Sequence, residues 1–108
     1  MVKLAGASPN TLGVFLRRNE NLEMSHTYFL RAAYFGHLNS QYNVATDFYN
    51  GDGVEQNNIP AFAWATMTSI EGDKDGEKLV EMILPSLSEE DFKLGEDLIA
   101  SLREKVLN

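Results

Sequence analysis

Small and apolar residues in the middle of the chain recur at the interval of one helical turn. Counted from Ser40, the residues Val44, Ala45 and Phe48 follow at i+4, i+5 and i+8. This spacing places them on one face of a helix. The pattern therefore predicts a helix over Ser40–Asn50, with one buried face and a polar face opposite.

A second helix is predicted over Pro60–Glu71, after a turn that contains Gly51 and Gly53. Glycine ends helices readily because it adopts left-handed backbone angles without steric cost. Asn57 is the expected N-cap, because its short polar side chain can accept a hydrogen bond from the first helical turn. One face of this helix combines small and large residues: Ala61, Trp64, Ala65 and Thr68. Together the two segments predict an αα-hairpin, whose small residues let its helices approach closely.

The same residues resemble the Sel1-like repeat, whose pattern is roughly A-Q-Y-x-L-[GA]-x-x-Y-x-x-G-x-G-V-x-x-D-x-x-x-A-x-x-W-x-x-x-A-A-x-x-G. The matching positions run without a gap: Ser40, Gln41, Tyr42, Val44, Ala45, Phe48, Gly51, Gly53, Val54, Asn57, Ala61, Trp64 and Gly72. The departures from the pattern are mild: Ser40, Val44, Phe48, Asn57 and the pair Thr68-Ser69. The resemblance implies an all-α fold, an α/α superhelix of stacked antiparallel helix pairs similar to tetratricopeptide arrays.

The segments on either side suggest one continuous stack over residues 1–108. At an offset of 36 residues, Tyr28 falls under Trp64 and Gly36 under Gly72, whereas the glycine-turn positions find no match. Residues 8–36 are therefore interpreted as a degenerate first repeat with a different turn, and residues 37–72 as a full repeat. Residues 73–108 lack the motif and carry a long charged helix, which is typical of a capping pair. About six helices are expected.

Helix-start signals support the two outer segments. Ser8 followed by Pro9 is typical of an N-cap and first helical position, and Leu12, Phe15 and Leu16 follow as a short apolar stripe. In the last segment, Ser88 precedes the acidic run Glu89-Glu90-Asp91. This arrangement suits a helix N-terminus, because acidic groups there oppose the helix dipole.

Composition and charge narrow the class of protein. The 108 residues contain no cysteine, which excludes disulfides and thiol chemistry, and the formal net charge is −7. The charge falls along the chain from +2 in residues 1–36 to −4 in residues 37–72 and −5 in residues 73–108. A nucleic-acid partner is not expected, because binding it requires basic surface. No apolar run is long enough for a membrane span, and residues 1–7 lack the core of a signal peptide, so a soluble, cytoplasmic protein is expected.

The candidate catalytic and metal-binding groups are few, and we expect no enzyme activity and no cofactor. His26 and His37 have no carboxylate at ligand spacing and are expected at the surface. Glu71, Asp73 and Asp75 echo the start of a calcium loop, but Met82 stands where that loop needs its bidentate acid. These acids are interpreted as a linker that caps helices.

One polar stripe remains as a candidate site. Asn43, Thr46, Asp47 and Asn50 lie at i, i+3, i+4 and i+7, opposite the apolar face of their helix. In repeats of this kind the first helices line the concave side, as the resemblance implies, so this stripe is a natural place for a peptide or protein loop. The expected function is a non-catalytic protein–protein interaction module, an adaptor or regulator. The alternative is a self-associating structural unit or the terminal part of a longer repeat array.

Overall fold

The computed structural model describes residues 8–107, and within them it contains six α-helices and one short 3₁₀ turn. The elements are α1 (Pro9–Arg18), α2 (Leu22–Tyr34), α3 (Leu38–Asn50), α4 (Asn58–Ile70), α5 (Lys74–Ile83), η1 (Leu84–Ser86) and α6 (Glu89–Lys105). The all-α fold and the expected number of helices are confirmed. Residues 1–7, in which we expected no signal-peptide core, lie outside the described part of the chain.

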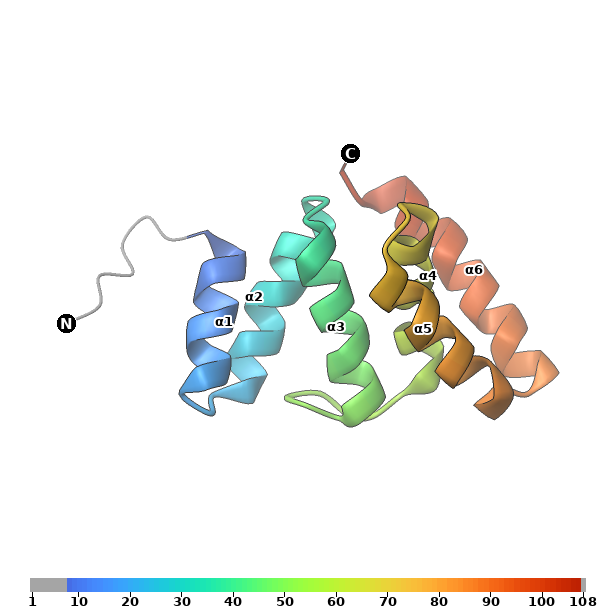
Figure 1. Ribbon diagram of the computed structural model, residues 1–108, viewed down its shortest axis with the longest axis horizontal. Helices are drawn as coiled ribbons and strands as arrows, with labels where there is room; N and C mark the ends of the chain where they lie inside the picture. Colours follow the sequence, from blue (N-terminus) through green and yellow to red (C-terminus); the bar gives the residue numbers. More distant parts are fainter. Residues whose placement is uncertain (1–7, 108) are drawn as a thin grey trace.

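The helices follow one another in a row (Figure 1). α1 and α2 form one antiparallel pair and α3 and α4 a second, whereas α5 and α6, the last pair along the chain, both pack against α4 rather than closely against each other. Each pair packs on the next through α2 against α3 and through α4 against α5 and α6. The result is an elongated stack of 49 × 27 × 22 Å. The division into a degenerate repeat, a full repeat and a capping pair stays a prediction, although its proposed boundaries fall in the turns between pairs.

The caps of the central hairpin are those predicted from the sequence, although the first residues of its helices differ slightly from the predicted ones. Asn57 accepts a hydrogen bond from the backbone N–H of Ile59, so it caps α4. Gly51 and Gly53 both have positive φ, at 76° and 73°, so the turn needs both glycines. Helix α3 begins two residues earlier than expected because His37 caps it, its Nδ1 accepting a hydrogen bond from the N–H of Ser40.

The predicted N-caps of the two outer pairs are present in the structure. Ser8 and Ser88 accept hydrogen bonds from the first turns of α1 and α6. Helix α5 starts at Lys74, because the carboxylate of Asp73 accepts a hydrogen bond from the N–H of Gly76 and caps it. The first pair turns through Glu20 at a φ of 60°, which performs there the reversal that glycine performs in the central pair.

Helix α4 lies at the centre of the core. Five successive residues on it are buried, Ala61 through Ala65, so it is surrounded rather than covered on one face. Trp64 is 3% exposed and stacks edge-on against Tyr34 of α2, with ring centroids 5.3 Å apart. Phe62 packs on the other side against Gly95 of α6, where a side chain larger than hydrogen would overlap its ring. The core thus joins all three helix pairs around α4.

Candidate protein-binding surfaces

Asp47, one of the four stripe residues, is buried, and its predicted place on a solvent-facing stripe is wrong. It is 2% exposed and forms an ion pair with Arg17 of α1. Its other carboxylate oxygen accepts a hydrogen bond from Nδ1 of His26, on α2, at 2.9 Å. Asp47 therefore ties the first helix pair to the second.

His26 is also buried, at 7% exposure, so its expected surface position is wrong as well. Its ring meets that of Phe48 edge-on at 5.0 Å between centroids. The spacing within one helix did not reveal this role, because the carboxylate partner lies 21 residues away on another helix. Together Arg17, His26 and Asp47 form a polar cluster between helix pairs.

The other three stripe residues lie at different depths along α3. The Thr46 hydroxyl donates to the carbonyl of Asn43 at 2.9 Å and is partly buried, while Asn50 is exposed at the end of the helix. Asn43 is half-buried and lines a hollow of about 280 Å³. Partner binding by Asn43, Thr46, Asp47 and Asn50 stays a prediction. Of these four residues, Asn43 is the one that lines this hollow.

This hollow, which we call the amide groove, is lined by the first helix of each pair. Its residues come from α1, α3 and the start of α5: Asn10, Val14, Asn39, Tyr42, Asn43, Asp73 and Asp75. Burial, followed by the nearby carboxylates of Asp75 and Asp73, raises the pKa of the Tyr42 hydroxyl above its ordinary value. The protonated hydroxyl can both donate and accept hydrogen bonds.

Some residues of the amide groove were not predicted from the sequence. Asn39 lies four positions before Asn43 on the same helix face, so helical spacing alone could have included it. Asn10, whose side-chain oxygen accepts a hydrogen bond from the Ser40 hydroxyl at 2.7 Å, comes from the neighbouring pair and had no local signal.

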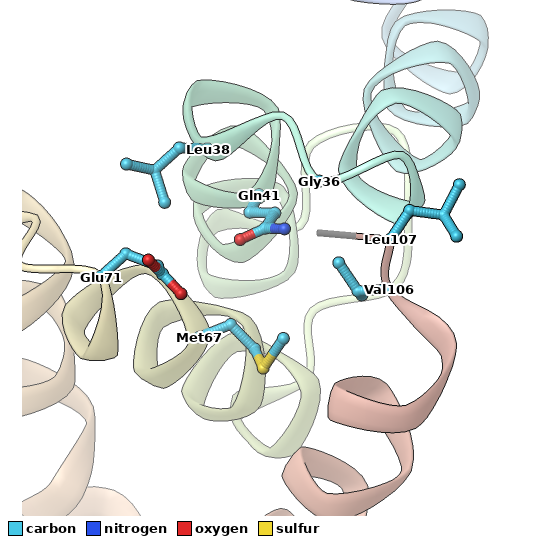
Figure 2. Close-up of a pocket in the computed structure, with 7 residues that line it drawn as sticks. All are labelled: Gly36, Leu38, Gln41, Met67, Glu71, Val106 and Leu107. Atoms are coloured by element: carbon cyan, nitrogen blue, oxygen red, sulfur yellow. The ribbon is translucent and has the colours of Figure 1, made fainter.

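A second and larger hollow, about 540 Å³, lies at the opposite end of α3 from Asn50 (Figure 2). We call it the tail pocket, because the segment after α6 forms one wall. Its lining residues are Gly36, Leu38, Gln41, Met67, Glu71, Val106 and Leu107. The N–H of Leu107 donates to the carbonyl of Tyr34 at 2.9 Å, which fixes this wall against the end of α2. Gly36, at a φ of 89°, has no side chain to keep the Leu107 carbonyl away.

The two hollows differ in which functional groups line them. They present amides, carboxylates, a phenol and apolar walls. Among residues 8–107 no three histidine or acidic side chains gather closely enough to hold a metal ion. None of the helices in this part of the chain has the length and apolar character to cross a membrane.

Comparisons with known proteins agree with this architecture. No family model matches the sequence, and no curated protein matches it. Among solved structures, the chain superposes on the crystal structure of a protective antigen present in uropathogenic Escherichia coli strains, described as displaying an SLR fold. The TM-score is 0.86 at 21% sequence identity. The match covers 91% of this chain and 22% of that protein, so this chain spans about a fifth of its length.

A superposition of this quality at low identity establishes the fold. The chain has a Sel1-like repeat fold, a helical solenoid related to tetratricopeptide arrays, as the central motif implied.

Proposed function

We propose that the protein is a non-catalytic protein–protein interaction module that holds an extended segment of a partner in the amide groove. The observation that carries this proposal is the gathering of three asparagine amides, Asn10, Asn39 and Asn43, along one hollow. Each asparagine side chain offers both a carbonyl acceptor and an amide donor, and an extended backbone offers the matching pair. Tyr42 adds a flat apolar face with a polar tip, a combination frequent at interfaces.

Random-peptide phage display against the immobilised protein tests the proposal without a known partner. Selected peptides should bind the wild type and lose affinity for an Asn39→Ala/Asn43→Ala variant. The loss should be about tenfold or more, because two hydrogen-bonding groups are removed from the contact. Glu96→Ala, on the exposed side of α6, is the matched control and should bind like the wild type.

Two outcomes would count against the groove. Equal peptide binding by the double variant would move the site elsewhere, and an Asn50→Ala effect would place it at the end of α3. Failure to select any peptide would remove support for the interaction function itself. The alternative expected from the sequence, self-association, is tested separately by whether the mass in solution depends on protein concentration.

A further inference from the structure

The tail pocket contains a buried polar group whose hydrogen bonding is incomplete. Gln41 is 4% exposed, and its amide nitrogen donates to the carbonyl of Ala33 at 3.1 Å. Its amide oxygen accepts no side-chain or backbone hydrogen bond from residues 8–107. Figure 2 shows this oxygen on the side of the pocket toward Glu71, with the nitrogen facing the other way. This oxygen faces the open hollow, so its lone pairs are available to an entering N–H group.

The rest of the pocket complements a particular shape of ligand. Met67, Val106 and Leu38 supply apolar side chains to the pocket, while the side chain of Leu107 is directed away from the other lining residues (Figure 2). The carboxylate of Glu71 lies at the open side, exposed and without an ion pair within 4 Å among the described residues. A hollow that combines apolar side chains with one carboxylate and one carbonyl fits an aliphatic stem that carries a cationic group with several N–H donors.

We infer that the tail pocket binds a basic side chain, lysine or arginine, of the partner protein, with its charge on Glu71 and the Gln41 oxygen. The inference rests on the proposed interaction function and names the chemistry of the partner. The net charge of −7 supports it, because an acidic protein attracts basic segments at long range. The volume of about 540 Å³ leaves room for the whole side chain.

Arg103 allows a test of whether the ligand of the tail pocket is positively charged. It lines a smaller hollow of about 190 Å³ that shares Met67, Glu71 and Val106 with the tail pocket. Its guanidinium therefore competes with an incoming cation for the field of Glu71. Removing that charge with Arg103→Gln should strengthen the binding of a cationic probe.

The test is an NMR titration of the full chain, followed through the side-chain amide of Gln41 and the backbone amide of Leu107. The probe is Nα-acetyl-lysine N-methylamide, and the matched probe is the norleucine analogue, which keeps the stem and lacks the ammonium group. The lysine probe should shift both signals and bind at least tenfold more tightly than norleucine. Glu71→Gln should weaken lysine binding about tenfold, because one charge-assisted contact is lost. Glu81→Gln, an exposed acid on α5 outside the pocket, should leave binding unchanged.

Several results would overturn the inference. Equal binding of norleucine, or no effect of Glu71→Gln, would show that the cation is not recognised. Weaker binding by Arg103→Gln would indicate an anionic ligand. Tighter binding of spermidine than of the lysine probe would assign the pocket to free polyamines rather than to a protein.

The two proposals can fail independently. Groove-dependent peptides that are indifferent to Glu71 would leave the interaction function standing and refute the pocket. If the lysine probe binds but no peptide can be selected, cation recognition by the tail pocket stands and the amide groove loses its support.

Discussion

The buried cluster of Arg17, His26 and Asp47 provides the sharpest test of how the helix pairs are held together. We consider the substitution Asp47→Ala. It removes a carboxylate that is 2% exposed and that joins side chains from α1 and α2 to α3. No backbone change is required, because alanine is a good helix former.

The cost can be estimated from the two contacts that are lost. The His26 side chain is 9% exposed, so its ring N–H is left without an acceptor, at about 1–3 kcal/mol. The Arg17 side chain is 35% exposed, so its guanidinium can return to water, and its pairing contributes at most about 1 kcal/mol. We expect a total loss of about 1–4 kcal/mol, and each kcal/mol corresponds to a fall in Tm of roughly 4–8 °C for a domain of this size.

Urea unfolding followed by circular dichroism would measure the loss, with Asp52→Ala as the matched control. Asp52 also faces Arg17, but at 3.8 Å and with its side chain 37% exposed, so its removal should cost less than about 0.5 kcal/mol. A double-mutant cycle between Asp47→Ala and His26→Ala should show a coupling energy of about 1 kcal/mol. Equal losses for Asp47→Ala and Asp52→Ala would refute the argument that the cluster joins the pairs.

Four further predictions concern the core and the turns. Trp64→Ala should cost about 3–5 kcal/mol, as for buried aromatic residues generally; an unchanged melting temperature would contradict its burial. Gly72→Ala should cost about 1–2 kcal/mol through its positive φ alone, because a methyl group there meets nothing within 4 Å. Gly53→Ala should cost more in the same urea titration, since its methyl group would overlap the Leu22 carbonyl; equal costs would show that this contact relaxes freely. Thr66→Val should raise the Tm by several degrees, because the Thr66 hydroxyl is buried without a partner among residues 8–107; a lower Tm would indicate a bond to water there.

Much of the fold could be predicted from the sequence because its signals are local. The caps Ser8, Asn57 and Ser88 act within one turn of their own helices, so a short window of sequence contains both partners. Gly51 and Gly53 act through their own backbone angles. Periodicity likewise predicted that Trp64 is buried, because a helix repeats its faces regardless of what covers them.

The candidate site was less predictable because it is built from separate helices. Asn43 was identified from α3 alone, whereas its groove partners Asn10 and Asp73 come from α1 and the start of α5. The tail pocket had no sequence signal, since one wall is made by a hydrogen bond from Leu107 to Tyr34.

The sequence by itself determined the helices, most of their caps and the pairing of the central hairpin, because these depend on contacts over a few residues. Only the tertiary structure decided which polar groups are buried. Asp47 and Asn50 occupy the same face of α3 by helical spacing. Asp47 is nevertheless buried against Arg17 and His26, whereas Asn50 is exposed. The difference arises because burial depends on what the neighbouring helices bring within reach, and the partners of Asp47 lie 30 and 21 residues away along the chain.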